Sequence, residues 1–349
     1  MSHRILVTGA SGYLGGTLLA RWKEAQLPPY SKLYALVRKQ EQANAVKEYG
    51  AEPITIDCQD PEAIKKTLVD NKITIILYLI DALGKTSVPF IEGLSEVKEA
   101  TGQDVHFVFT TGAKLFSSHV GTPTDKPLLD TNPALYDIQK SLDVPSSNGW
   151  MRVAVDANNT VIEKAGDLGV RAYIFAPCIV YGKGEGFGNK ISIQTVAIVK
   201  AAKKVRRVYK VDKGRPTWPV CHVVDNSTLY LEIVRNILAG KDIGHGRDGY
   251  FLGSAGSVAW DDLYAAMAQA MAKRGAVDDA EVKEADDEVL QKMGNALDSH
   301  KEMVPVHLGG SCTFTAEHGR KIGWKPQYEA QHILEAADEE VELILENLE

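Results

Sequence analysis

The segment YDIQK, residues 136–140, places a lysine four positions after a tyrosine. A tyrosine hydroxyl has an ordinary pKa near 10, and it becomes a useful acid or base at neutral pH when a neighbouring cation lowers that pKa. In a chain with 13 tyrosines, about one such spacing arises by chance. Two alternatives therefore stand: a coincidence, or a catalytic pair in which Tyr136 points into a substrate site.

A second stretch with chemical potential is VTGASGYLGG, near the start of the chain. Its glycines have G-x-x-G-x-x-G spacing between an apolar β-rich run and a helix-like segment. Such glycines permit a tight turn and let a pyrophosphate approach backbone amides at a helix N-terminus. The pattern predicts a dinucleotide site. The residues expected to contact the dinucleotide here are Gly9, Ser11, Gly12, Tyr13, Leu14 and Gly15.

The choice of dinucleotide depends on the next apolar run, which ends in Arg38 and Lys39. An NAD site has a carboxylate at this position, which binds the ribose 2′-hydroxyl. A guanidinium instead suits a 2′-phosphate, which accepts charge-assisted hydrogen bonds. The sequence therefore favours NADP(H); the alternative is that both residues are ordinary surface cations.

These candidate sites need a scaffold, and apolar β-rich runs recur along the first half of the chain. The runs lie at residues 4–9, 33–38, 52–57, 73–80, 105–111 and 171–177. Near-continuous apolar runs are typical of a parallel sheet buried on both faces, and the intervening lengths suit βαβ crossovers. We predict an α/β fold with a doubly wound parallel sheet of the Rossmann type and a smaller C-terminal α/β substrate lobe.

The pattern becomes irregular after residue 182, where GKGEGFGNK forms an evident loop. We predict an NAD(P)-binding domain over residues 1–185, with residues 216–245 returning to it. The substrate-binding lobe is expected to comprise residues 186–215 and 246–349. A chain of 349 residues is long enough for one large α/β unit with an attached lobe.

Composition excludes several classes of function. A net charge of −7 argues against a nucleic-acid surface, which needs concentrated positive charge. The four cysteines lack metal-type spacing, which predicts reduced thiols and no metal site. Without a signal-peptide core or an apolar stretch of roughly 18 residues, we expect a cytoplasmic protein that does not contact membranes. Its expected partner is a small-molecule substrate, and its expected state a monomer or homodimer.

With these features the chain resembles the extended or atypical branch of the short-chain dehydrogenase/reductase superfamily, and within it uncharacterised fungal proteins of the epimerase/dehydratase-like type. VTGASGYLGG, ITIDCQD, FAPCIVYGKGEG and WPVCHVVDNSTLYLEIV carry the resemblance. It implies that the ends of successive strands contact the cofactor. The residues implied are Asp57, Cys58, Ile80, Thr110, Pro177 and Ile179.

The same resemblance implies a serine or threonine after the fifth strand, a tyrosine on the following helix and a lysine four residues later. Counting back from Gly169 by the family's spacing puts Trp150 or Met151 at the tyrosine position. Ala154 or Val155 then stands at the lysine position. None of these side chains relays a proton, so the usual pair is missing from its usual place.

The segment TTGAKLF, residues 110–116, resembles the Thr-Gly-x-Lys segment of plant iridoid synthase and its progesterone-reducing relatives, although the two residues after Lys114 depart from that group. The likeness implies a role for Lys114 in 1,4-reduction of enones. Hydride addition to the β-carbon leaves an oxyanion that needs only a donor such as Lys114 or Tyr136. Thr111 completes the candidate catalytic set, with the nicotinamide ribose or the strand end as its alternative partner. The alternative for Lys114 is a solvent-facing loop residue.

The predicted function is an NADP(H)-dependent oxidoreductase that reduces a small enone or carbonyl compound of the kind found in secondary metabolism. The candidate aromatic substrate residues are Trp150, Tyr181, Phe187 and Trp218. Arg152 and Asp156, four apart on one helix, are expected to pair with each other. Two alternatives remain: a non-catalytic dinucleotide sensor similar to NmrA-type regulators, or a redox-neutral isomerase or cyclase that uses bound NADP(H) as a scaffold.

Overall fold

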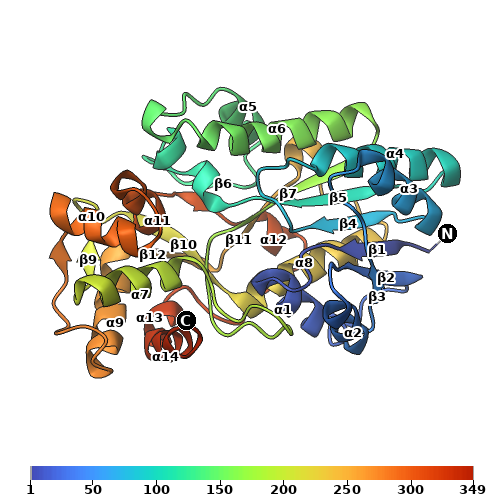
Figure 1. Ribbon diagram of the computed structural model, residues 1–349. Coiled ribbons are helices and arrows are strands. Elements are labelled where there is room, and N and C mark those ends of the chain that lie inside the picture. The colour runs from blue at the N-terminus through green and yellow to red at the C-terminus, as the bar shows by residue number, and fades with distance from the viewer. Residues whose placement is uncertain (1, 349) are drawn as a thin grey trace.

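The computed structural model describes residues 2–348, and a seven-stranded sheet forms its larger part (Figure 1). The strand order is β11-β7-β5-β4-β1-β2-β3, and all neighbouring strands run parallel. This confirms the predicted doubly wound parallel sheet. The strands are β1 (Arg4–Val7), β2 (Lys32–Leu36), β3 (Glu52–Ile54), β4 (Ile75–Tyr78), β5 (His106–Thr110), β7 (Arg171–Pro177) and β11 (Tyr250–Gly253).

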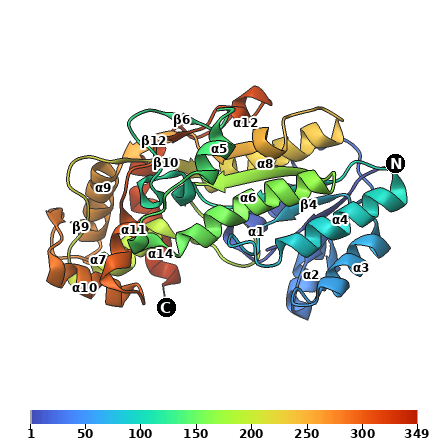
Figure 2. The same ribbon diagram turned by 90° about the horizontal axis from the view of Figure 1, so that it is seen from above.

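Helices cover both faces of this sheet, as Figures 1 and 2 show. On one face lie α3 (Pro61–Asn71), α4 (Ser87–Thr101) and α6 (Met151–Asp167), and on the other α1 (Tyr13–Arg21), α2 (Gln40–Glu48) and α8 (Val223–Leu238). Local sequence fixes where a helix begins: at α3 the Asp60 carboxylate accepts the Glu62 and Ala63 amides, with proline at the first helical position.

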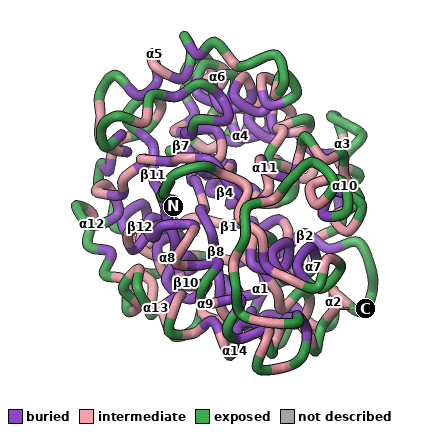
Figure 3. The backbone as a smooth tube through the Cα atoms, turned by 90° about the vertical axis from the view of Figure 1, so that its left-hand side faces the viewer, coloured by how far each residue is buried: buried purple, intermediate pink, exposed green. Residues whose placement is uncertain are grey.

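The core lies between the two helical layers, and Figure 3 shows buried residues concentrated along the sheet. Every residue of β4 is buried. Because helices exclude water from both faces, each position of such a strand favours an apolar side chain, which explains the unbroken runs in the sequence. Among residues 2–348, no helix is both long and apolar enough to cross a bilayer.

The smaller lobe is built on a three-stranded sheet with the order β12-β10-β8. Its strands are β8 (Ile179–Tyr181), β10 (Thr217–His222) and β12 (Gly256–Ala259), and its longer helices are α7 (Gln194–Val205), α9 (Trp260–Lys273), α10 (Asp287–Ala296) and α14 (Ala337–Asn347). Two short strand pairs join distant segments: β6 (Leu128–Leu129) with β14 (Phe314–Thr315), and β9 (Tyr209–Lys210) with β13 (Lys283–Glu284).

Short helices complete the chain. The α-helices are α5 (Leu135–Lys140), α11 (Val304–Leu308), α12 (His318–Lys321) and α13 (His332–Glu335), and the 3-10 helices are η1 (Ala113–Phe116), η2 (Ser118–Val120), η3 (Ser146–Asn148), η4 (Gly246–Asp248) and η5 (Lys301–Met303). Of these, η1 and α11 contribute to the site described below.

The chain passes between the two parts at other positions than the sequence pattern indicates. β11, in the stretch expected to belong to the lobe, pairs with β7 in the large sheet. β10, in the stretch expected to return to the nucleotide domain, pairs with β8 and β12 in the small sheet. Only α8 from that stretch lies on the large sheet, where it packs against α1.

Candidate active site

The glycine-rich loop between β1 and α1 has the geometry of an anion cradle. Gly9 has a φ of +67°, in the left-handed region that favours glycine, and a Cβ at Gly15 would collide with the Gly9 carbonyl. Gly12 caps α1 without a side-chain hydrogen bond. The first-turn amides of a helix have no acceptor within the helix, so they remain available for an anion such as a pyrophosphate. The loop therefore fits a dinucleotide.

A loop from the start of the lobe is locked against this cradle. The Asn189 amide donates to the Ser11 carbonyl over 3.0 Å. A Cβ at Gly188 would collide with that same carbonyl, and one at Gly186 would collide with Gly16. The repeated glycines in GKGEGFG signal this close approach of two backbones. The motif is visible in the sequence, but only the structure identifies what it contacts.

The residues proposed for the adenosine half lie along one edge of the sheet. Arg38 and Lys39 follow β2, Asp57 and Cys58 follow β3, and Ile80 follows β4. These strands are parallel and adjacent to β1 or to one another, so their carboxyl ends meet at the same edge. Arg38 and Lys39 are exposed and take part in none of the ion pairs formed within residues 2–348. This edge thus offers two exposed cations that have no ion-pair partner among the described residues, with the Asp57 carboxylate at the same edge.

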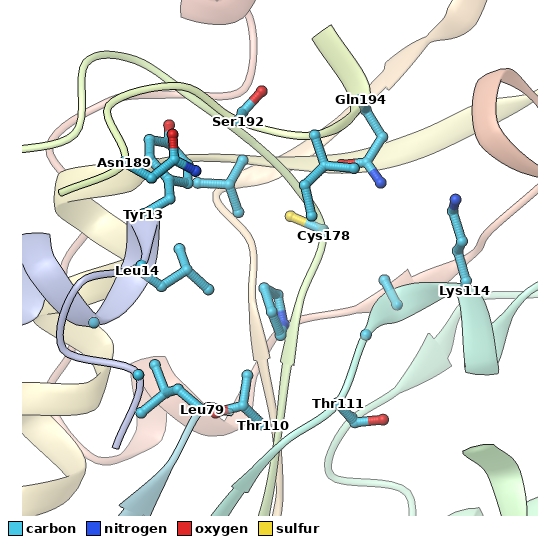
Figure 4. A pocket seen from close by; sticks show the side chains of 18 of the residues that line it. Tyr13, Leu14, Leu79, Thr110, Thr111, Lys114, Cys178, Asn189, Ser192 and Gln194 are labelled. Carbon is cyan, nitrogen blue, oxygen red and sulfur yellow. The ribbon is translucent and has the colours of Figure 1, made fainter. Parts of the chain in front are cut away.

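A cavity of about 500 Å³ lies beyond the carboxyl ends of β1, β5 and β7 (Figure 4). One end is formed by the dinucleotide loop, which contributes Gly9, Gly12, Tyr13, Leu14 and Gly15. The remaining walls are Leu79, Thr110, Thr111, Gly112, Ala113, Lys114, Pro177, Cys178, Val180, Asn189, Ser192, Ile193, Gln194, Trp218 and His307. Within the described chain, no aspartate or glutamate lines this cavity.

Lys114 stands on η1, directly after β5, and its side chain projects into the cavity (Figure 4). Its ammonium has no hydrogen-bond or ion-pair partner in the part of the chain that the structure describes. Burial among largely apolar walls lowers the pKa of Lys114 to about 8. A lysine with this pKa exchanges a proton readily near neutral pH.

The two threonines at the end of β5 have different environments. The Thr110 hydroxyl is hydrogen-bonded to the Tyr230 hydroxyl at 2.7 Å. Thr111 is buried, its amide donates to the Phe175 carbonyl, and its hydroxyl has no partner among the described residues. Both line the cavity. The Thr111 hydroxyl is therefore unpaired but enclosed, whereas the Thr110 hydroxyl is engaged by Tyr230.

Tyr136 and Lys140, the YDIQK pair, lie on α5 and share a carboxylate on α6. The Tyr136 hydroxyl and the Lys140 ammonium both donate to Glu163. The Arg247 guanidinium lies 4.2 Å from the centroid of the Tyr136 ring. Burial and the Glu163 carboxylate raise the pKa of Tyr136, against the opposing effect of Lys140. Tyr136 does not line the cavity, and these contacts explain the spacing as helix packing.

Replacing Tyr136 by phenylalanine separates packing from catalysis. We expect catalytic activity within about twofold of the parent, because the hydroxyl faces Glu163 and not the cavity. Loss of one hydrogen bond should lower the free energy of unfolding by about 1 kcal/mol. Denaturant unfolding and steady-state kinetics on the same preparation check both values. A large loss of activity at unchanged stability would restore Tyr136 as a catalytic residue.

The position at which the family's tyrosine–lysine pair is expected contains neither residue and does not open on the cavity. Met151, Ala154 and Val155 are buried on α6, and no described residue of α6 lines the cavity. Arg152 and Asp156 form the predicted ion pair at 2.7 Å. The site must therefore obtain any proton from another element.

Of the four aromatic residues proposed for the substrate, the structure places only Trp218 on the cavity wall. Trp150 is 49% exposed, and the Phe187 ring stacks on Tyr49 at a centroid distance of 6.3 Å. The Tyr181 hydroxyl is hydrogen-bonded to His332, and Tyr181 lines a separate cavity. Three of the four expected positions are thus not brought to the site.

Two residues expected to contact the cofactor, Ser11 and Ile179, do not line the cavity. Ile179 is fully buried in β8, and the Ser11 hydroxyl accepts from the Gln42 amide; neither lines the cavity, whereas Pro177 does. Sequence reasoning missed Gln194 and His307, which reach the cavity from α7 and α11. Neither lies in a recognisable motif.

Known proteins resemble this chain in sequence. Residues 5–91 match the NAD dependent epimerase/dehydratase family. A ketoreductase of Stigmatella aurantiaca, named for 4-hydroxy-2-methyl-3-oxo-4-farnesyl-3,4-dihydroquinoline-1-oxide, is 24% identical over 251 residues, which cover 71% of this chain and 67% of the relative.

Solved structures match over almost the whole length. The PbgP3 protein from Burkholderia pseudomallei has a TM-score of 0.64 at 15% identity, with 99% of this chain and 98% of that chain covered. The dTDP-glucose 4,6-dehydratase DesIV from Streptomyces venezuelae, solved with NAD bound, has a TM-score of 0.62 at 14% identity, with 99% and 97% covered. Residues 5–91 therefore match the NAD dependent epimerase/dehydratase family, and the described chain shares the fold of these solved structures.

Proposed function

We propose that this protein is an NADP(H)-dependent oxidoreductase that reduces a small enone or carbonyl compound, with Lys114 supporting the substrate oxygen. The observation that carries the proposal is the position of Lys114: its unpaired ammonium lies in the same cavity as the uncapped N-terminus of α1. The ketoreductase name of the Stigmatella aurantiaca relative supports the direction of the chemistry.

The cofactor site follows from the residues at the sheet edge. The first-turn amides of α1 would hold the pyrophosphate, and Arg38 with Lys39 would hold a ribose 2′-phosphate, because both cations are exposed without acidic partners among the described residues. NADPH supplies the hydride when it is bound. Thr111, whose enclosed hydroxyl has no partner among the described residues, would bind the nicotinamide ribose or the substrate after a change of side-chain rotamer.

Lys114 would stabilise the charge that develops on oxygen during the reduction. A donor placed in a largely apolar, water-poor site interacts more strongly with a developing oxyanion than the same donor does in water. With a pKa of about 8, its ammonium can also release the proton that the product oxygen requires. No tyrosine is needed for this step.

Absorbance of the reduced nicotinamide, followed with NADPH and a panel of enones, ketones and quinones, tests the proposal. We expect substrate-dependent loss of absorbance with at least one class, and none with the matched saturated hydrocarbon or alcohol. Steady absorbance across the panel, combined with tight NADPH binding, would contradict the reductase and favour a dinucleotide sensor. Product formation without loss of absorbance would favour a redox-neutral isomerase.

A further inference from the structure

Three polar side chains from separate segments meet the cavity away from the dinucleotide loop. Lys114 comes from η1, Gln194 from the first position of α7, and His307 from α11 of the lobe. Figure 4 shows Lys114 and Gln194 at one end of the cavity and Tyr13 and Leu14 at the other. This group of three residues is called the donor cluster below.

The side chains of the donor cluster have no hydrogen-bond or ion-pair partner among the described residues, and the cavity has no acidic wall residue. The buried Glu340 carboxylate is engaged by Thr195 and Gly182 and lines a different cavity. Unpaired donors in a recess are expected to meet their acceptor on a ligand.

The helix that begins at Gln194 also favours binding of a negatively charged group. α7 is 12 residues long, and its N-cap residue, Ile193, provides no side-chain hydrogen bond. Ser192, Ile193 and Gln194 all line the cavity. An uncapped helix N-terminus carries partial positive charge and free amides. The cavity is therefore bordered by two helix N-termini, α1 at the dinucleotide end and α7 at the other, where the Glu340 carboxylate accepts from the first-turn Thr195 hydroxyl at 2.7 Å and offsets part of the positive charge.

We propose that the substrate carries a carboxylate close to its reducible carbonyl group. Gln194, His307 and the N-terminus of α7 bind the carboxylate, and the three N–H donors of the Lys114 ammonium serve both the carboxylate and the carbonyl oxygen, which faces the cofactor. This inference rests on the proposed function, since it names the class of compound reduced: an oxo acid or enone acid with an apolar body. Trp218, Val180 and the 71%-exposed Ile193 supply apolar contact for that body.

A carboxylate fits the donor cluster better than a phosphate does. The cluster contains one full positive charge and no arginine, whereas bidentate arginine is over-represented where proteins recognise phosphate. A single negative charge balances Lys114. Gln194 and His307 then act as neutral donors, in keeping with burial and the Lys114 charge lowering the pKa of His307.

Binding of an anion should be accompanied by proton uptake, because a negative charge favours protonation of nearby bases. The Lys114 charge acts on His119 and on His307, and Asp212 acts on His119 with the opposite sign. His119 is additionally bonded to the Gly309 carbonyl at 2.9 Å. Lys114 has a pKa of about 8, so we expect it to be the group that takes up most of the proton at pH 8.

Calorimetric titration of the whole protein with 2-naphthoate, 2-naphthamide and 2-naphthyl phosphate, with and without saturating NADP+, tests the inference without any need for turnover. We expect 2-naphthoate to bind on the order of 30-fold more tightly than the amide, the low end for a buried charge pair. Titrations at pH 8 in buffers of different ionisation enthalpy should reveal proton uptake for the carboxylate only.

Matched variants locate the effect. Lys114→Met and His307→Phe should each reduce the carboxylate preference, and Lys114→Met should also abolish the proton uptake. Lys200→Met removes an exposed charge from the far part of α7 and should leave the preference unchanged. The wild-type comparison of acid with amide needs no variant, so a folding defect in one of them does not prevent the test.

Three outcomes would overturn the inference: equal affinity for the acid and the amide, tighter binding of the naphthyl phosphate, or competition between 2-naphthoate and NADP+. The last outcome would place the anion in the dinucleotide cradle. Failure of the reductase proposal would give another pattern of results: 2-naphthoate would still bind more tightly than the amide, but no compound in the absorbance panel would be reduced. Conversely, reduction of neutral ketones without any carboxylate preference would spare the reductase and refute only the donor cluster.

Discussion

Replacement of Lys114 by methionine is expected to lower kcat/KM for the reduced substrate by roughly 10²- to 10³-fold, the range found when one donor to a developing oxyanion is removed. Methionine preserves the length of the side chain but removes the charge and all donors. Because Lys114 stands apart from the cradle and from Arg38, the dissociation constant of NADPH should stay within about twofold. Stopped-flow hydride transfer and NADPH fluorescence titration measure the two quantities.

The same variant should not be less stable than the parent. Lys114 is held in the cavity without a partner in the described chain, and burial lowers its pKa to about 8. A lysine with a lowered native pKa penalises folding fully below that value, and the penalty disappears as pH rises through the pKa of the unfolded chain. The melting temperature of Lys114→Met at pH 7 should therefore equal or exceed that of the parent. Lys200→Met is the control for loss of a charge.

Activity of Lys114→Met within about threefold of the parent would contradict the role of Lys114 as oxygen donor.

The pH profile gives an independent test of the same group. If the ammonium of Lys114 is the active form, kcat/KM of the parent should fall as pH rises past about 8. The Lys114 charge acts on His119 and His307, but the pKa of each is lowered, mainly by burial. Both are therefore neutral above pH 7 and do not produce this fall. Lys114→Arg should retain part of the activity with a flat profile over the same range, and a flat profile in the parent would contradict the assignment.

Features that depend on local sequence could be predicted. The runs that form β1, β2, β4, β5 and β7 are largely apolar at successive positions because both faces of the sheet are buried there, and the sequence alone reveals this property. The glycine loop is equally local, since one turn and one helix start account for its spacing. Lys114 is close to the end of β5, so a strand prediction alone places it at the ligand-binding edge.

Features that depend on which side of its strand or helix a residue faces could not be predicted from the sequence. Val180 and Tyr181 are consecutive in β8, and because side chains alternate along a strand, Val180 lines the main cavity while Tyr181 lines another. An aromatic residue type therefore does not predict the substrate wall. Gln194 and His307 come from helices far along the chain, and only the packing of the lobe brings them to Lys114. Tyr136 is the reverse case, in which a suggestive spacing is explained by contacts with Glu163 and Arg247.

Replacement of Arg38 by aspartate is also expected to have a large effect, and it tests the choice between NADP(H) and NAD(H). Arg38 follows β2, is exposed and has no acidic partner among residues 2–348. A charge-assisted hydrogen bond contributes about 1.5–3 kcal/mol, so its loss should weaken NADPH binding on the order of 10- to 100-fold. The new carboxylate would also repel the 2′-phosphate and could accept the 2′-hydroxyl of NADH. We therefore expect the ratio of NADPH to NADH affinity to fall on the order of 100-fold or more.

The matched control for this experiment is Lys47→Asp, which makes the same change of charge at an exposed position near the end of α2. A long-range effect of net charge would lower NADPH affinity equally in both variants and would weaken steeply with added salt. A specific contact would appear only in Arg38→Asp, and would spare NADH. Fluorescence titration of both variants with both dinucleotides at two salt concentrations separates these cases. An unchanged preference in Arg38→Asp would mean that the cation after β2 does not select the cofactor, and that the 2′-phosphate, if bound, is held elsewhere.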